Sequence, residues 1–596
     1  MDVFRTENNC LKFHYDAEEL WIQPWGANSL RIRATKLAEM PKENWALEMP
    51  VEDIVPKIQI EEKRASIING KIKAVISSYG KLTIYNSKDE ILLDEYLRNR
   101  LDVFADYCSA LDIEAREFKP ILGGDYHLSM RFVSNPEEKI YGMGQYQQPY
   151  LNLKGTDLEL AQRNSQASVP FAVSSLGYGF LWNNPGVGRV MFGKNITTWE
   201  AYSTKVLDYW ITAGDSPAEI EEAYASVTGT VPMMPDYAMG FWQCKLRYQT
   251  QDELLNVARE YKKRGLPISV IVIDYFHWPL QGDWKFDEKY WPDPDAMIQE
   301  LKEMGIELMV SIWPTVDYRS ENFQEMKEKG YLIRTDRGFR IVMDFQGNTV
   351  HYDATNPAAR EYVWQKAKKN YYDKGIKVFW LDEAEPEYSV YDFDNYRYHM
   401  GPNVQVGNIY PALYAKTFFD GMKAEGQENI INLLRCAWAG SQKYGALVWS
   451  GDIHSSFSSL RNQLAAGLNM GLAGIPWWTT DIGGFHGGDP KDPKFQELLV
   501  RWFEYGTFCP VMRPLFYDFP KDSKCWEIED QYMFGPDVLV APVTYADMRK
   551  RTIYLPEGSQ WTNFDTEEIY EGGQVIEVDA PLSQIPVFTR NGRKLK

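Results

Sequence analysis

The sequence predicts an α/β protein in which a (β/α)8 TIM barrel is flanked by an N-terminal β-sandwich and a small C-terminal β-sandwich. In residues 1–230, Val, Ile, Tyr and Phe alternate with polar residues in short segments separated by turn residues, which is typical of antiparallel strands. In residues 231–520, apolar runs alternate with amphipathic helical stretches, which indicates repeated βα units. Residues 521–596 return to short β segments. We therefore expect three domains with these limits.

The middle region contains eight candidate barrel strands, at residues 238–243, 269–274, 307–313, 377–383, 430–436, 446–452, 475–481 and 509–515. Amphipathic helices are expected between them, such as 251–265 and 293–305, and the second closes on Gly305, where helices favour glycine. A small β insertion is expected at 338–355. An open doubly wound sheet would instead require a glycine-rich phosphate-binding turn after an early strand, and the sequence shows none. The strand count therefore favours the barrel.

Composition excludes several classes of partner. The 596 residues carry 64 Lys and Arg against 83 Asp and Glu, a formal net charge of −19, which argues against nucleic acid or an anionic membrane because both require a basic surface. The seven histidines lack metal-ligand spacing, so no metal and no other cofactor is expected. Reduced thiols, no signal-peptide pattern and no long apolar stretch predict a cytoplasmic protein. The cysteines are scattered, at Cys10, Cys108, Cys244, Cys436, Cys509 and Cys525.

Charged residues directly terminate several candidate strands: Asp274, Asp382, Arg435, Asp452 and Asp481. Reactive groups of (β/α)8 barrels lie at the carboxyl ends of the strands, although a single Asp there is more often a helix cap or a loop anchor. Cleavage of a glycosidic bond needs two carboxylates that face each other across a pocket, and the barrel pattern gives Asp382 and Asp452 positions from which to do so. Barrel geometry alone leaves open which of the two is the nucleophile.

The sequence motifs around these residues resemble glycoside hydrolase family 31, the retaining α-glycosidases. The central motifs are KVFWLDEAEPE at 377–387 and LVWSGD at 447–452. Supporting segments occur in the family's order along almost the whole chain: IQPWGANSLRIR (22–33), YGMGQ (141–145), RGLPISVIVIDYFHW (264–278), WKFDEKYWPDP (284–294), GIPWWTTDIGGF (474–485) and PLSQIPVFTRNG (581–592). The resemblance implies the same three-domain fold and an α-glycoside or a small oligosaccharide as the partner. Whether the chain forms a homo-oligomer stays open.

The resemblance also implies roles for individual residues. Asp382 matches the catalytic nucleophile and Asp452 the general acid/base. Asp274 matches an Asp that binds substrate hydroxyls, and Trp313 matches an aromatic residue of the sugar pocket. Two residues are expected to support the nucleophile, Arg435 and Glu385.

Four further residues are candidates for substrate binding because they lie near strand ends: Phe276, His277, Trp284 and Asp481. Each has an alternative structural role. Trp284 is as well suited to core packing as to sugar stacking. A histidine in the position of His277 is more often a residue of the barrel rim whose ring nitrogens are hydrogen-bonded within the protein. Asp481 is equally suited to binding substrate and to anchoring its own loop.

Two departures from the α-glucosidase pattern bear on the sugar. Arg513-Pro514-Leu515 stands where many members of the family have Arg-Asn-His, and Asp274 is followed by Tyr275-Phe276-His277-Trp278 instead of Ile-Asp-Tyr. Bulky aromatic side chains at this point would fill the space of a hexose hydroxymethyl group, which favours an α-xylosidase. Trp380 speaks against this, because one α-xylosidase group has Lys two residues before the nucleophile.

The alternatives within the family are an α-glucosidase or an α-galactosidase. Outside it, a non-catalytic carbohydrate-binding protein is disfavoured because binding alone needs neither Asp382 nor Asp452. A metal-dependent barrel hydrolase is disfavoured because histidine is scarce near the strand ends.

Overall fold

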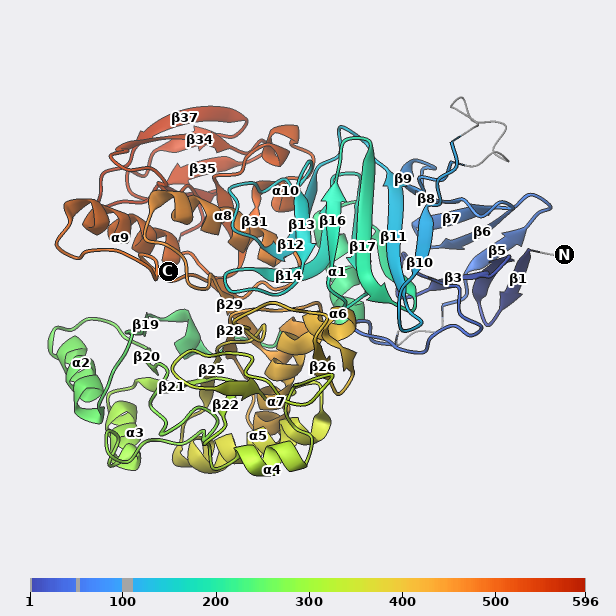
Figure 1. Cartoon of the computed structure of the whole chain (residues 1–596). Coiled ribbons are helices and arrows are strands. Elements are labelled where there is room, and N and C mark those ends of the chain that lie inside the picture. Colours follow the sequence, from blue (N-terminus) through green and yellow to red (C-terminus); the bar gives the residue numbers. More distant parts are fainter. Residues whose placement is uncertain (1–2, 50–53, 99–110, 595–596) are drawn as a thin grey trace. The chain divides into compact units, whose positions relative to one another are not determined.

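A computed structural model describes residues 3–49, 54–98 and 111–594 of the chain (Figure 1). The chain forms two compact units. Unit 1 comprises Met1–Ala161, Ser168–Thr230 and Ser450–Lys596, and unit 2 comprises Gln162–Ala167 and Val231–Trp449. The cysteines within the described residues are free thiols, whereas Cys108 lies outside those residues. No helix in the described parts of the chain is long and apolar enough to cross a membrane.

The first part of unit 1 consists of antiparallel sheets, as the alternating pattern predicts. Side chains of β6 (Arg64–Asn69) and β7 (Ile72–Ser77) alternate between buried and more exposed positions, because successive side chains of a strand point to opposite faces. One apolar core is shared by several of these sheets. The largest sheet has the order β1 (Phe4–Glu7), β2 (Cys10–Tyr15), β3 (Glu18–Pro24), β4 (Ser29–Thr35), β18 (Leu207–Ala213), β15 (Tyr178–Trp182), β14 (Ala167–Ser174) and β12 (Ile140–Gln145).

Two smaller sheets complete this part. In one, the long strands β11 (Tyr126–Val133) and β17 (Ile196–Thr204) pair in the middle, between β10 (Arg116–Pro120) on one side and β16 (Gly188–Phe192) and β13 (Asp157–Leu160) on the other (Figure 1). The other is a meander of β5 (Lys57–Ile60), β6, β7, β8 (Leu82–Asn86) and β9 (Ile91–Asp94). Helix α1 (Pro217–Thr228) follows, and its N-terminus is capped by the Ser216 side chain, which accepts a hydrogen bond from the N–H of Glu219.

The C-terminal part of unit 1 contains β30 (Trp478–Thr479), the helices α8 (Phe457–Leu472), α9 (Pro493–Gly506) and α10 (Leu515–Asp518), and two antiparallel sheets. The larger sheet runs β31 (Met512–Pro514), β32 (Tyr532–Phe534), β33 (Val538–Val540), β38 (Val587–Arg590), β35 (Gln560–Asn563) and β36 (Ile569–Glu571). The smaller pairs β34 (Lys550–Leu555) with β37 (Gln574–Asp579).

The expectation of a parallel barrel strand at 509–515 is wrong. The strand found there, β31, pairs antiparallel with β32, and Arg513 lies opposite Met533. An apolar run predicts burial, but it does not specify the partner strand, because that choice depends on contacts far away in the sequence.

Unit 2 is built on a curved parallel sheet with helices on its outer side (Figure 1). Its strands are, in order, β19 (Trp242–Gln243), β20 (Val270–Ile273), β21 (Glu307–Ile312), β25 (Val378–Leu381), β28 (Asn432–Leu434) and β29 (Ala446–Trp449). Every pair is parallel, which confirms the βα reading of the first six candidate strands. The helices are α2 (Gln251–Lys263), α3 (Pro294–Glu303), α4 (Phe323–Glu328), α5 (Pro357–Asn370), α6 (Asn403–Val406) and α7 (Tyr410–Ala424).

Local sequence explains where these helices begin and end. The side chains of Thr250 and Asp293 accept hydrogen bonds from backbone N–H groups in the first turns of α2 and α3. Gly305, just beyond α3, has φ +67°, a conformation that glycine adopts without the steric cost of a Cβ.

The predicted β insertion at 338–355 contains one regular strand, β24 (Thr349–His351), which pairs with β22 (Thr315–Asp317). A separate small sheet contains three short strands: β23 (Arg334–Thr335), β26 (Tyr396–Tyr398) and β27 (Gly401–Pro402).

Candidate active site

The carboxyl edge of the parallel sheet in unit 2 brings several predicted residues together. Trp313, Asp382 and Arg435 each directly follow the last residue of a strand, β21, β25 and β28 respectively. Ile312 pairs with Leu381, and Leu381 with Leu434, so the three following residues lie next to one another at the same edge. The Asp382 N–H donates to the carbonyl oxygen of Ile312 at 3.1 Å, which anchors the start of the loop.

Arg435 is the electrostatic centre of this edge. Only 2% of its surface is exposed, and its Nη1 lies 3.5 Å from Asp382 Oδ1. Its Nε and Nη2 donate to the two carboxylate oxygens of Glu385, at 2.7 and 3.1 Å. A guanidinium held this way favours the ionised form of its carboxylate neighbours, which is the form that a nucleophile needs. Arg435 and Glu385 thus lie where a supporting role for Asp382 requires them.

The loop after β25 is also shaped by backbone geometry. Glu383 has φ +56°, a left-handed conformation that costs a residue with a side chain of this length of order 1–3 kcal/mol. In this conformation the Glu383 N–H donates to Asp382 Oδ1 at 2.9 Å. The same strained geometry occurs at Phe276 (φ +54°) and Trp284 (φ +45°), which follow β20. Such residues tend to occur at functional sites, where surrounding packing holds them.

Aromatic side chains form a cluster beside these carboxylates. Phe276 and Tyr275 pack on a buried core that includes Trp278 and Trp313. The ring centroid of Phe276 lies 6.0 Å from that of Trp313, and Tyr275 lies 5.2 Å from Trp313. Phe276 and Tyr275 are half-buried, so each keeps an accessible ring surface. Such a surface suits the apolar face of a sugar ring.

Two predicted binding residues are packed in ways that limit contact with a ligand. Trp284 is 1% exposed, and its Nε1 donates to the carbonyl oxygen of Trp313 at 3.0 Å, so it fixes the backbone that carries Trp313. His277 is also 1% exposed; its Nδ1 is 2.9 Å from the Asp274 carbonyl oxygen and its Nε2 is 3.0 Å from the Tyr371 hydroxyl. Burial lowers the pKa of His277 to about 4, so its ring is neutral near pH 7.

Asp274 itself is 4% exposed, and its Oδ1 accepts a hydrogen bond from the Tyr275 N–H at 2.7 Å. This bond fixes the side chain at the end of β20.

Asp452 and Asp481 belong to unit 1, where both are half-buried. Their loops are joined by hydrogen bonds. The Asp481 N–H donates to Ser450 Oγ at 3.1 Å, and the N–H groups of Phe485 and His486 donate to the carbonyl oxygen of Ile453. Within unit 1, the loop that carries Asp452 is therefore held by hydrogen bonds from backbone N–H groups of the loop that carries Asp481.

From the sequence, Glu383 and Glu387 are interpreted as loop groups or as groups behind the residues that touch substrate, and in the structure the carboxyl groups of both lie within 3.2 Å of Arg435. The signal that was available is the spacing, since Glu383, Glu385 and Glu387 alternate along one short loop just after the nucleophile candidate. Tyr371, which contacts His277, went unassigned, because it lies at the end of α5 and far from any strand end in sequence. Among the described residues, no group of His, Cys, Asp and Glu is arranged to hold a metal ion.

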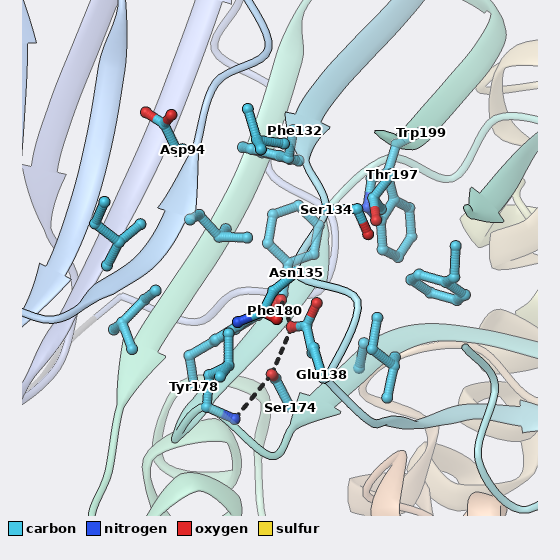
Figure 2. Close-up of a pocket in the computed structure, with 18 residues that line it drawn as sticks. Asp94, Phe132, Ser134, Asn135, Glu138, Ser174, Tyr178, Phe180, Thr197 and Trp199 are labelled. Carbon is cyan, nitrogen blue, oxygen red and sulfur yellow. Dashed lines mark hydrogen bonds between the residues drawn. The ribbon is translucent and has the colours of Figure 1, made fainter. Parts of the chain in front are cut away.

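Unit 1 also contains a cavity of about 190 Å³ in its N-terminal part (Figure 2). Phe132, Phe180, Trp199 and Glu138 are among the residues that line it. Glu138 Oε1 accepts hydrogen bonds from Ser174 Oγ and the Tyr178 hydroxyl, both at 2.6 Å, and Oε2 pairs with Lys154. Both carboxylate oxygens have partners within the fold, so the cavity is explained as imperfect packing around a satisfied polar network.

Comparison with known proteins gives matches to two family models. Residues 231–552 match the glycosyl hydrolases family 31 TIM-barrel domain, and residues 19–190 match the glycosyl hydrolase 31 N-terminal galactose mutarotase-like domain. An uncharacterized family 31 glucosidase, ORF2, of Pseudescherichia vulneris is 57% identical over 521 residues, which cover 86% of this chain and 98% of that protein. The α-xylosidase of Saccharolobus solfataricus is 33% identical over 541 residues, covering 79% of this chain and 72% of that protein.

Among solved structures, the crystal structure of a family 31 α-xylosidase from a soil metagenome, complexed with xylose, is similar over 99% of both chains, with a TM-score of 0.98 and 56% identity. The TIM-barrel domain expected from the sequence is therefore confirmed, and the N-terminal β domain is identified as galactose mutarotase-like. The chain belongs to glycosyl hydrolase family 31 and is a glycoside hydrolase.

Proposed function

We propose that this protein is a retaining, exo-acting α-xylosidase that removes terminal xylose from short oligosaccharides, with Asp382 as nucleophile and Asp452 as general acid/base. The observation that carries the proposal is the ion pair of Asp382 with the buried Arg435 beside the aromatic cluster of Phe276 and Trp313. The solved relative with a TM-score of 0.98 is an α-xylosidase in complex with xylose. We further propose domain limits at 1–230, 231–520 and 521–596, a C-terminal β-sandwich and a cytoplasmic location.

The proposed reaction has two steps. In the first, the Asp382 carboxylate attacks the anomeric carbon, the bond to the glycosidic oxygen breaks, and Asp452 gives its proton to that oxygen. The product is a glycosyl ester of Asp382, which no longer carries a negative charge. In the second step, Asp452 takes a proton from a water molecule as the water oxygen bonds to the anomeric carbon, and the Asp382 carboxylate leaves. Two inversions give net retention of configuration.

The residues of unit 2 support these steps in distinct ways. Arg435 keeps Asp382 ionised before the attack. Phe276 is half-buried and offers ring surface to the apolar face of the sugar, whereas Trp313 is 4% exposed and packs against Phe276 at the wall of the proposed pocket. We assign hydroxyl binding to Asp274, whose carboxylate is held by the Tyr275 N–H. His277 and Trp284 keep a place in the proposed site as groups that hold Asp274 and Trp313, through the hydrogen bonds described above.

An α-glucosidase is the second candidate, because the relative at 57% identity is described as a glucosidase. A panel of p-nitrophenyl α-glycosides separates the two candidates. We expect kcat/KM for the α-xyloside to exceed that for the α-glucoside by at least about tenfold, the discrimination that a pocket gains by excluding one hydroxymethyl group. Proton NMR of the first product should show the α-anomer of xylose. A preference for the glucoside would reject the xylosidase assignment but not the family mechanism.

Phe276 is the residue that we expect to set this preference. Replacing it with alanine removes a half-buried ring at the end of β20, so the kcat/KM ratio of α-xyloside to α-glucoside should fall by about tenfold. Phe564→Ala is the matched control, because that ring is 54% exposed and belongs to unit 1. An unchanged ratio in Phe276→Ala would show that sugar selection lies elsewhere in the pocket.

A further inference from the structure

The loop after β25 places more negative charge around Arg435 than one guanidinium can balance. Four carboxyl groups lie within 3.5 Å of the Arg435 guanidinium: Asp382, Glu383, Glu385 and Glu387. If all four were ionised, the single positive charge of Arg435 would face four negative charges. Uncompensated charge in a buried site is costly, and a carboxyl group in that position binds a proton instead.

The four carboxyl groups are not equally well paired. Glu385 receives two hydrogen bonds from Arg435, and Glu387 receives one and has 30% of its side chain exposed. Glu383 has the poorest environment for a charge. Its side chain is 5% exposed, its Oε2 lies 3.2 Å from Arg435 Nη2, and that oxygen accepts no hydrogen bond. The charged and titratable groups around Glu383 include Asp382, Glu385, Glu387, Arg435 and Tyr414.

We propose that Glu383 is a neutral carboxylic acid in the working enzyme and acts as a positioning residue for Asp382. The proposal rests on the assignment of Asp382 as nucleophile. Because Glu383 is neutral, the positive charge of Arg435 is shared among fewer anions, and a larger part of its field stabilises the ionised nucleophile. The backbone of Glu383 completes the arrangement by donating its N–H to Asp382 Oδ1.

The electrostatics of the cluster agree with this assignment. Burial raises the pKa of Glu383 well above its ordinary value, although the charge of Arg435 opposes the increase. Burial also raises the pKa of Glu385, but there the hydrogen bonds from Arg435 favour the ionised form. An ionised Glu383 would place a second negative charge beside Asp382 and would raise the pKa of the nucleophile. A proton on Glu383 therefore keeps Asp382 ready to react.

The first test is the pH dependence of stability of Glu383→Gln, which reproduces the neutral acid but does not titrate. A raised folded-state pKa means that the proton on Glu383 stabilises the wild type fully below the unfolded value of about 4.3, and that this contribution is lost as pH rises towards the folded value. The melting temperature of Glu383→Gln relative to wild type should therefore rise with pH, by about 2 °C or more between pH 5 and pH 8. If Glu383 were ionised and stabilised by Arg435, its folded-state pKa would lie below about 4.3, and the difference would stay constant between pH 5 and pH 8. A constant difference over this range would therefore overturn the proposal.

The control is Glu361→Gln, which changes an exposed carboxylate on α5. Its melting temperature relative to wild type should be the same at every pH in this range. Should Glu383→Gln fail to fold, Glu383→Met offers an uncharged side chain of similar size, and the same sign is expected. Both measurements read the protonation of Glu383 without any substrate, so they stand even if the wild type hydrolyses no α-glycoside. A wild-type protein that hydrolyses no α-glycoside would instead reject the proposed function.

The second test is the acid limb of kcat/KM against pH, which reports ionisation of the nucleophile in the free enzyme. If Glu383 is neutral, the midpoint of this limb in Glu383→Gln should stay within about 0.3 pH units of the wild-type midpoint. This holds even if the maximum value of kcat/KM changes. Removal of an ionised neighbour would instead shift the midpoint to lower pH, by about one unit or more. Such a shift would overturn the proposal, and a purely structural role of Glu383 would not produce it.

Discussion

Asp382→Ala is expected to lose nearly all hydrolysis of α-glycosides, with kcat lower by about four orders of magnitude. The substitution removes the only group that we assign to attack the anomeric carbon, while Phe276 and Asp274, the residues that we assign to sugar binding, are unchanged. KM should therefore change much less than kcat. Steady-state kinetics with p-nitrophenyl α-xyloside measures both quantities.

Rescue of the Asp382→Ala variant by azide tests more specifically whether Asp382 is the nucleophile. Azide is small enough to occupy the space vacated by the Asp382 carboxylate, and it should restore part of the activity by forming a β-xylosyl azide, since a single displacement inverts the configuration. Asp392→Ala is the control, because Asp392 is exposed on the loop that follows β25. If Asp382→Ala kept wild-type turnover, the mechanism would be refuted, and a non-catalytic binding protein would again be a candidate.

Arg435→Leu is expected to lower the free energy of unfolding by about 3–5 kcal/mol, because it leaves Asp382, Glu385 and their neighbours buried without a positive charge. It should also raise the pKa of Asp382 and move the acid limb of kcat/KM to higher pH. Thermal melting and denaturant titration measure the first effect, and a pH–rate profile measures the second.

Two control variants separate the effect of the Arg435 charge from the effect of its hydrogen bonds and of its burial. Arg435→Lys keeps the charge but loses the two-pronged hydrogen bonding to Glu385, so it should give an intermediate loss. Arg259→Leu removes an exposed arginine that pairs with Glu300, and the expected cost is only about 0–1 kcal/mol. If Arg435→Leu were as stable as Arg259→Leu, the carboxyl groups around Arg435 would already be neutral, and its role in holding Asp382 ionised would be lost.

Much of the barrel region could be predicted from the sequence because its signals are local. Apolar runs and helix caps repeat within a few residues, and the strands at 270–273, 307–312 and 378–381 follow from them directly. The run at 509–515 shows the limit of such signals. It is buried, but its partner is β32, and no local pattern records that choice.

The site shows the same division. Asp274, Asp382 and Arg435 could be named from the sequence, because the residue after a parallel strand lies at the carboxyl edge of the sheet whatever the rest of the fold does. His277 and Trp284 could not be interpreted, because their roles depend on burial and on hydrogen bonds to Asp274 and Trp313. The sequence alone thus determined the order of the strands and the chemistry at their ends. The tertiary structure decided which carboxyl groups share Arg435, because charge balance in a buried cluster depends on distances between side chains that meet only after the chain has folded.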